Sequence, residues 1–253
     1  MRISTSKARK RENYVLNEAS FAFGVVILAA GASTRMGRCK LLLPWGEKTI
    51  LTHLLDQWWH AGAAQIAPVI DPSNQLLREA LAQAGFSPSN WIENASPQLG
   101  MFSSLREASG WTGWHSTLTH FAICLGDQPH VQMSTLRLLL DAARKNPTRI
   151  CQPALHGSAG HPIVLPANNF RELAQRNVHN LRAYVRTHEA LRLRMPVEDP
   201  AVSEDLNTPE DYARLKPKEW AESDRLQSIP VLALGPTGRG PLVSHPFLFK
   251  RER

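Results

Sequence analysis

The chain has 253 residues, 43% of them hydrophobic and 20% charged, a balance that is ordinary for a globular protein of one or two domains. Its net charge is +7, but residues 1–20 and 216–253 each carry an excess of +3, which leaves only +1 in the body. Because duplex binding requires a dense basic surface, we expect no nucleic-acid partner. No run of about 18 consecutive apolar residues occurs, so we also expect no membrane-spanning helix.

Two features bear on the compartment. The three cysteines, Cys39, Cys124 and Cys151, show neither a CxxC pair nor zinc-ligand spacing. An odd, sparse set is typical of a reducing compartment, so we expect a cytoplasmic protein. Basic residues before the apolar run 21–28, with small residues after it, also outline a secretory signal. That run starts late, behind an interrupting polar segment, and we therefore expect it to be a strand.

Apolar spacing predicts strands that alternate with helices from residue 21 to 145. Short apolar runs predict strands at 21–28, 65–70, 91–93 and 120–125. Helical spacing predicts helices at 49–61, 73–84 (with Ser73 as the N-cap), 101–110 and 134–145. This alternation is typical of an α/β fold with a single, doubly wound, mostly parallel sheet of the Rossmann-like kind.

The pattern after residue 145 is less regular. We expect a hairpin or excursion at 154–166, helices near 170–175 and 181–187, a short strand near Leu193 and a last helix from Pro209. The composition changes after Leu215, where prolines and glycines occur with little periodicity. The sequence therefore predicts a polar N-terminal extension at 1–20, one domain at 21–215 and a C-terminal appendage at 216–253.

The segment LAAGASTRMGRCK, residues 28–40, follows the first predicted strand. Gly31 and Gly37 allow backbone angles that other residues rarely adopt, and backbone amides gathered in such a turn favour phosphate oxygens. Arg35 and Lys40 would add a planar guanidinium and a compact ammonium to the same phosphates. The spacing matches neither the P-loop nor GxGxxG, so neither of those sites is indicated.

Residues 28–44 resemble the opening of the MobA/MocA-like nucleotidyltransferases, whose pattern is LA(A/G)GxSxRMGxxKxLLP. The resemblance implies a GT-A-like fold in which this loop wraps a nucleoside triphosphate. It implies catalytic roles for Arg35 and Lys40, which would stabilise charge on the α-phosphate and the leaving group. It implies nucleotide contacts by Leu28, Ala29, Ala30, Gly31, Ser33, Arg35 and Lys40.

Two acidic segments are candidates for holding Mg²⁺. Asp127, in the LGDQP of residues 125–129, follows a predicted strand directly, where ligands of such sheets bind. The resemblance assigns it catalytic and metal-ligand roles, although an aspartate at such a junction also caps turns. Residues 204–211, EDLNTPED, resemble the family's DIDTPED, which makes Asp205 a possible second ligand. Asn207 replaces the second aspartate of that pattern, and Thr208-Pro209 also fits an ordinary helix start.

Two further segments carry the resemblance. GMFSSL, residues 100–105, is similar to GM(S/G)SSL, which implies nucleotide contacts by Gly100, Ser103 and Ser104. Ser103 is equally suited to capping a helix, and Phe102 departs from the small residue of the pattern. GHPI, residues 160–163, is similar to GHPV, which implies that His161 contacts the acceptor. A buried hydrogen bond within the core is the alternative role for that histidine.

The resemblance spans residues 23–215 and implies a Mg²⁺-dependent nucleotidyltransferase. LAAG together with GHP favours the cytidylyltransferase branch, which transfers CMP from CTP to molybdopterin cofactor and releases pyrophosphate; a molybdoenzyme is a possible recipient. Three alternatives stay open. They are a guanylyltransferase or other NTP transferase of the same family, a non-catalytic molybdenum-cofactor-binding chaperone, and a nucleic-acid-binding module that acts through the basic ends of the chain.

Overall fold

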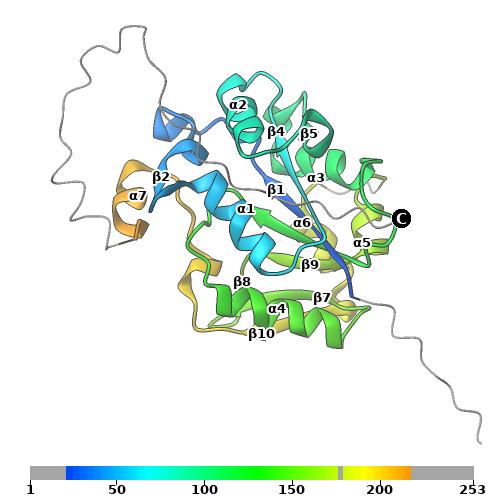
Figure 1. The fold of residues 1–253 in the computed structure, drawn as a ribbon. Helices are drawn as coiled ribbons and strands as arrows, with labels where there is room; N and C mark the ends of the chain where they lie inside the picture. The colour runs from blue at the N-terminus through cyan, green and yellow to red at the C-terminus, as the bar shows by residue number, and fades with distance from the viewer. Residues whose placement is uncertain (1–20, 176–178, 218–253) are drawn as a thin grey trace, which may run out of the picture. The chain divides into compact units, whose positions relative to one another are not determined.

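The computed structural model describes residues 21–175 and 179–217. The predicted N-terminal extension lies outside these ranges, and so does the predicted C-terminal appendage apart from Lys216 and Pro217. Within the described ranges, helices cover both faces of a central sheet (Figure 1). This arrangement confirms the predicted α/β fold, because the two faces of the sheet are buried under separate layers of helix.

One half of the sheet is parallel and matches the sequence prediction closely. Along the strand order β10-β7-β9-β6-β1-β4-β5, this half comprises β6 (His120–Leu125), β1 (Phe23–Leu28), β4 (Gln65–Ile70) and β5 (Ile92–Glu93). Leu28, the last residue of β1, lies in register with Leu125 of β6 and Val69 of β4. The loops that follow these strands therefore leave the sheet at one edge, where ligands of such folds bind.

The other half is mixed. It consists of β7 (Ile150–Leu155), β8 (Ser158–Ala159), β9 (Ile163–Pro166) and β10 (Arg192–Pro196). Strand β9 runs antiparallel to both β6 and β7, while β8 pairs antiparallel with β7 and β10 pairs parallel with it. The excursion expected at 154–166 is thus part of the main sheet, and β7 is a strand that the sequence pattern did not predict.

The helices form two layers with separate buried cores. One core contains side chains of α1 (Ile50–His60), α2 (Gln75–Gln83) and α4 (Met133–Lys145). The opposite core contains side chains of α3 (Met101–Gly110), α5 (Ala167–Glu172) and α6 (Leu181–Thr187). The remaining elements are the hairpin β2 (Pro44–Trp45) and β3 (Lys48–Thr49), α7 (Pro209–Leu215) and the 3₁₀ turns Thr34–Met36, Lys40–Leu42, Pro88–Asn90, Pro97–Leu99, Glu189–Leu191 and Pro200–Val202. No described helix is both long enough and apolar enough to span a membrane.

The helix starts follow capping chemistry, with one difference from the prediction. Helix α2 is capped by Asn74, whose side chain accepts a hydrogen bond from the backbone N–H of Leu77, and not by the expected Ser73. Ser73 instead donates, through its backbone N–H and its hydroxyl, to the carboxylate of Asp71 two residues earlier. The start of α7 agrees with the prediction, since Thr208 caps a helix whose first residue is proline.

The segment between β10 and α7 crosses the carboxyl end of β6. The backbone N–H of His161 donates to the carbonyl of Val202 over 2.8 Å, and that of Leu206 donates to the carbonyl of Asp127 over 2.8 Å. Gly160 lies so close to this segment that a Cβ on it would come within 2.0 Å of the Val202 carbonyl oxygen. The late segment is thereby fixed beside the loop that follows β6.

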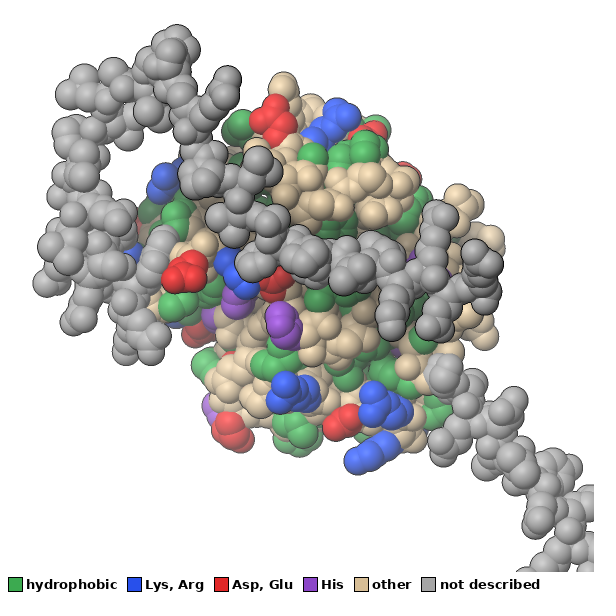
Figure 2. Space-filling view, in the orientation of Figure 1, with side chains coloured by type: hydrophobic (Ala, Val, Ile, Leu, Met, Phe, Trp, Pro, Cys, Tyr) green, Lys and Arg blue, Asp and Glu red, His purple; other side chains and the backbone are tan. Residues whose placement is uncertain are grey.

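Surface charge is mixed on the visible described surface. In the view of Figure 2, Lys and Arg side chains lie among Asp and Glu side chains. This distribution agrees with the small net charge of residues 21–215. The absence of a nucleic-acid partner stays a prediction.

Candidate active site

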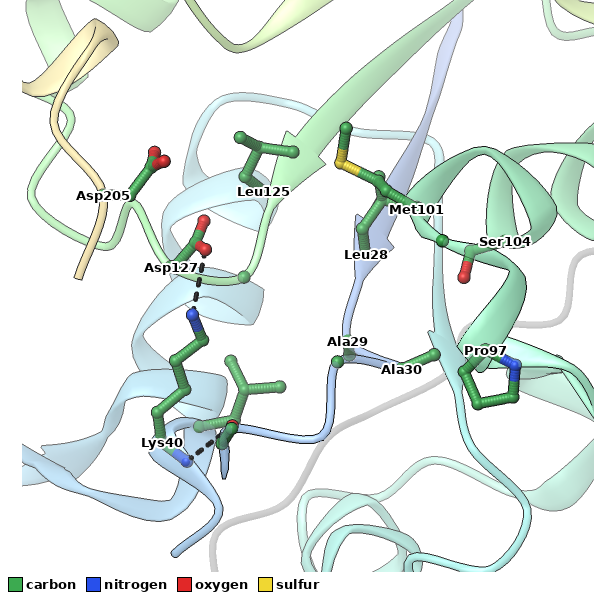
Figure 3. Close-up of a pocket in the computed structure, with 15 residues that line it drawn as sticks. Leu28, Ala29, Ala30, Lys40, Pro97, Met101, Ser104, Leu125, Asp127 and Asp205 are labelled. Carbon is green, nitrogen blue, oxygen red and sulfur yellow. Dashed lines mark hydrogen bonds and ion pairs between the residues drawn. The ribbon is translucent and has the colours of Figure 1, made fainter. Parts of the chain in front are cut away.

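A pocket of about 290 Å³ opens where β1 and β6 end (Figure 3). Ten of the residues singled out from the sequence line it: Leu28, Ala29, Ala30, Gly31, Ser33, Lys40, Gly100, Ser104, Asp127 and Asp205. These residues come from four segments that are far apart in the chain. The parallel half of the sheet brings three of the segments together, and the crossing segment before α7 supplies Asp205.

The wall after β1 is largely backbone. Ala29 is held by a hydrogen bond from its N–H to the carbonyl of Val69 over 2.9 Å. The chain then turns through Ser33, which adopts a left-handed conformation, and the Ser33 hydroxyl accepts from the N–H of Lys40 over 3.3 Å. A Cβ on Gly31 would meet no atom within 4 Å, so space for a ligand lies directly against this backbone.

Lys40 reaches across the pocket to the acidic side. Its Nζ donates to Asp127 Oδ2 over 2.9 Å, to the carbonyl oxygen of Leu206 over 3.1 Å and to Asn207 Oδ1 over 3.5 Å. The side chains of Lys40 and Asp127 are 15% and 22% exposed, so their ion pair is partly shielded from water. Figure 3 shows this pair between the loop after β1 and the loop after β6.

Asp205 is the second carboxylate of the pocket. Its Oδ1 accepts a hydrogen bond from Gln128 Nε2 over 3.0 Å. Burial, followed by repulsion from the charge of Asp127, raises the pKa of Asp205 above its ordinary value. Two carboxylates that disfavour each other's charge become more stable when a cation binds between them.

The donor set therefore fits a divalent cation such as Mg²⁺. No group of three or more His, Cys, Asp or Glu side chains that could hold a metal occurs in the ranges that the structure describes. Mg²⁺ needs no such cage, because it is commonly bound by one or two carboxylates together with substrate phosphates and water. Asp127 and Asp205 would hold the ion, and a nucleotide in the same pocket would complete its coordination.

Three predicted residues lie outside the pocket lining. Arg35 is exposed on the turn Thr34–Met36. The Ser103 hydroxyl donates to the carbonyl of Gly100 and accepts from Asn94, so it stabilises the turn before α3; Gly100 is the N-cap residue, and no side chain caps this helix. The roles of Arg35 and Ser103 in binding stay predictions.

His161 is the third residue outside the lining. Its Nδ1 is buried and has no hydrogen-bond partner among the described residues. Burial lowers the pKa of this histidine, and the nearby Asp127 only partly offsets that effect. The lowered pKa favours the neutral form of His161, and its contact with an acceptor stays a prediction.

Several residues that shape the site were not singled out from the sequence. Gln128 is 4% exposed and orients Asp205; its position directly after Asp127 was the available signal. Position 126 requires a glycine, because the backbone of Leu28 lies so close that a Cβ there would be 2.7 Å from its carbonyl oxygen. The apolar lining residues, which only the folded geometry identifies, are Leu41, Pro97, Met101 and Leu125.

Comparison with characterised proteins agrees with this geometry. Residues 25–191 match the model of the MobA-like NTP transferase domain. The molybdenum cofactor cytidylyltransferase of Escherichia coli K12 is 27% identical over 197 residues, which are 77% of this chain and 96% of that protein. The nicotine blue oxidoreductase of Paenarthrobacter nicotinovorans is 29% identical over 201 residues, which are 75% of this chain and 94% of that protein.

A solved structure extends the likeness to three dimensions. The crystal structure of Rv0371c from Mycobacterium tuberculosis H37Rv superposes with a TM-score of 0.62 at 29% identity, and the match covers 77% of this chain and 97% of that one. A second structure of that protein, in complex with manganese, gives a TM-score of 0.55 at 26% identity over 77% and 98% of the two chains. The family model covers well over half of the residues, and the chain therefore belongs to the MobA-like NTP transferase family.

Proposed function

We propose that the protein is a Mg²⁺-dependent nucleotidyltransferase that transfers CMP from CTP to molybdopterin cofactor and releases pyrophosphate. The observation that carries the proposal is the meeting of Lys40, Asp127 and Asp205 in one pocket with the backbone of Ala29 to Gly31. A nucleoside triphosphate and its metal require a cation, carboxylates and a stretch of backbone that phosphate oxygens can approach closely, and this pocket contains all three. The cytidylyltransferase among the relatives supports the choice of reaction.

The chain's own residues bind and orient the reactants in this reaction. A terminal phosphate oxygen of the acceptor attacks the α-phosphorus, and the bond from that phosphorus to the bridging oxygen of pyrophosphate breaks. The acceptor phosphate is already ionised near pH 7, so no general base is needed. The backbone at Ala29 to Gly31 would fix the triphosphate, and Lys40 would stabilise negative charge that develops on the α-phosphate and leaving group.

Asp127 and Asp205 complete the arrangement. When bound, Mg²⁺ would neutralise charge on the triphosphate and favour departure of pyrophosphate. Gln128 fixes the direction of the Asp205 carboxylate by donating to its Oδ1. The Leu206 N–H, bonded to the Asp127 carbonyl, keeps the two acidic segments side by side.

CTP is proposed over GTP because the chain carries LAAG at residues 28–31 and GHP at residues 160–162. Three other functions become outcomes of the test. A guanylyltransferase or another family member would use a different nucleotide or acceptor, and a chaperone would bind molybdenum cofactor without turnover. A nucleic-acid-binding module would lose binding when residues 1–20 and 216–253 are removed, whereas the pocket at the end of β1 would keep its small-molecule ligands.

The deciding experiment measures pyrophosphate release by the full chain with Mg²⁺, molybdopterin cofactor and each of the four NTPs in turn. We expect release with CTP, and loss of release in Asp127→Ala. Asp141→Ala, which removes a carboxylate from the exposed face of α4, is the matched control and should retain activity. Release with GTP alone would indicate a guanylyltransferase. Binding of molybdenum cofactor without release would favour the chaperone, and full turnover by Asp127→Ala would reject the metal role.

A further inference from the structure

The ammonium of Lys40 has no unused proton in this structure. Its three acceptors are a carboxylate oxygen of Asp127, the backbone carbonyl of Leu206 and the side-chain amide oxygen of Asn207. An ammonium carries three N–H donors, so this set satisfies all of them. The acceptors belong to the loop after β6 and to the crossing segment before α7, while Lys40 belongs to the loop after β1. The lysine thus bridges all three segments without a ligand.

The same oxygen atoms form a set suited to a hard metal ion. Carboxylate, backbone carbonyl and amide oxygens are the ligands that Mg²⁺ and similar cations use in proteins. Asp205, the other carboxylate of the pocket, directly precedes Leu206 in the chain. The Lys40 ammonium therefore lies where the chain offers oxygen ligands to a divalent cation.

The Lys40 ammonium and a divalent metal ion would compete for the same oxygen atoms because both are positively charged. The residues that line the pocket include two carboxylates and the single positive charge of Lys40; Lys40 and Asp127 are partly buried, whereas Asp205 is exposed. A divalent ion that entered with the ammonium in place would meet like charge at short range, where water screens the repulsion poorly. Movement of the ammonium towards a phosphate group removes that repulsion and frees an oxygen of Asp127.

We propose that Lys40 closes the metal position while the pocket is free of nucleotide, and that a nucleotide phosphate opens it by drawing the ammonium away from Asp127. This inference rests on the proposed function for the identity of the nucleotide. It makes metal binding dependent on nucleotide binding, so that the chain alone binds divalent cations weakly. By linkage, removal of the lysine charge strengthens metal binding by the nucleotide-free protein.

The test measures Mn²⁺ binding to the full chain without nucleotide, from the electron paramagnetic resonance signal of the free ion. We expect Lys40→Met to bind Mn²⁺ about tenfold or more tightly than the wild type, because the competing charge is gone. Lys48→Met removes an equal charge from an exposed side chain on β3 that pairs with Asp56, and it should bind Mn²⁺ like the wild type. The double variant Lys40→Met, Asp127→Asn should lose the gain, which assigns the bound ion to this pocket.

An Mn²⁺ affinity of Lys40→Met equal to or weaker than that of the wild type overturns the inference. Circular dichroism checks that each variant is folded. A measurement on the wild type tests the inference even when a variant does not fold. The side-chain ¹⁵N resonance of Lys40 should shift with metal-free CTP but stay unchanged with millimolar Mg²⁺ alone. A shift with Mg²⁺ alone overturns the inference as well. Pyrophosphate release is scored separately, so an active enzyme whose Lys40→Met variant gains no Mn²⁺ affinity rejects this inference and leaves the proposed function standing.

Discussion

Two of the four segments that line the pocket are loops that follow the neighbouring parallel strands β1 and β6, and they have opposite character. The loop after β1, residues 29–40, carries the basic side chains and is exposed at most positions between Gly31 and Arg38. The loop after β6, residues 126–131, carries Asp127 and is buried at Gly126, Gln128 and Pro129. One loop is open to a ligand, whereas the other is packed into the protein.

The hydrogen bonds of the two loops show the same difference. Side chains of helix α1 hold the acidic loop, since His53 Nε2 lies 3.0 Å from the Pro129 carbonyl oxygen and Gln57 Nε2 donates to that of Val131 over 2.7 Å. The basic loop is held largely by its own local bonds, such as the one from the N–H of Met36 to the carbonyl of Ser33. Apart from Asp127, which we propose as a metal ligand, we expect substitutions in the acidic loop to lower stability more than substitutions in the exposed part of the basic loop, residues 31–38.

Lys40 should give the largest effect, because in the proposed reaction its charge acts directly on the triphosphate. We expect Lys40→Ala to lower the rate of pyrophosphate release by about 10²- to 10³-fold, as for loss of one group that stabilises transition-state charge. Its urea midpoint should also fall, because the substitution leaves the partly buried Asp127 carboxylate without its ion-pair partner. Assays of release and of urea unfolding on the same preparation check this. A loss of less than tenfold would mean that Lys40 does not act on the reacting phosphates.

Two pocket glycines, one on each loop, allow the contribution of the two loops to stability to be compared. Gly126→Ala would place a Cβ 2.7 Å from the Leu28 carbonyl oxygen, so we expect the free energy of unfolding to fall by about 1–3 kcal/mol. Gly31→Ala meets no atom within 4 Å and should change that free energy by less than about 0.5 kcal/mol. Urea unfolding followed by circular dichroism measures both. Equal losses in the two variants would contradict the contrast between the loops.

Arg35 tests whether the basic loop closes on its ligand. Because this side chain is exposed and outside the pocket lining, we expect Arg35→Ala to lower pyrophosphate release by only about tenfold, less than Lys40→Ala. Steady-state kinetics with CTP as the varied substrate gives the comparison. A defect as large as that of Lys40→Ala would show that the loop folds over the triphosphate and brings Arg35 to the phosphates.

The smallest expected effect is the pH dependence that His130 adds to the acidic loop. Burial lowers the pKa of His130 below its ordinary value of 6.5, with Glu204 opposing the shift. Between pH 6.5 and the lower pKa of the folded state, His130 binds more protons in the unfolded chain than in the folded chain, so stability falls as the pH falls through that window. We expect a loss of at most about 1 kcal/mol per pH unit from this residue after a discount for solvent screening.

Urea midpoints measured at pH 7.5 and 5.5 give that slope. His130→Gln should show a shallower slope than the wild type, since the substituted side chain does not titrate. His60→Gln, at the exposed end of α1, is the matched substitution for comparison. An unchanged slope in His130→Gln would remove His130 as a source of pH sensitivity.

Much of the parallel half of the fold could be predicted from apolar runs. Strands β1, β4 and β6 are covered by helices on both faces, so their sequences are nearly continuous hydrophobic segments. Strand β7, ICQPAL, escaped prediction because Gln152 interrupts its apolar run inside the strand, whereas the glutamine of β4, Gln65, is only the first residue of that strand. The buried Gln152 is satisfied by contacts that no local pattern contains: its amide donates to the Gly160 carbonyl, and its oxygen accepts from Arg192.

The pocket was predicted well where a residue type carries the chemistry and poorly where geometry alone selects it. Lys40, Asp127 and Asp205 stand out by charge and position, and all three line the pocket. Pro97 and Met101 line it through their apolar surfaces, which ordinary core residues share. Ser103 was singled out for its hydroxyl but lies outside the pocket lining. That hydroxyl is hydrogen-bonded to the carbonyl groups of Ser96 and Gly100 in the adjoining turn.

The late position of Asp205 has a consequence for how the protein is made. Strand β10, the last strand along the described chain, ends at Pro196, before this carboxylate and the Leu206 carbonyl are synthesised. A nascent chain that has emerged only to residue 200 contains every strand of the described sheet, together with Lys40 and Asp127, but lacks the second acidic group. The second acidic group of the pocket is therefore synthesised after every strand of the described sheet and after Lys40 and Asp127.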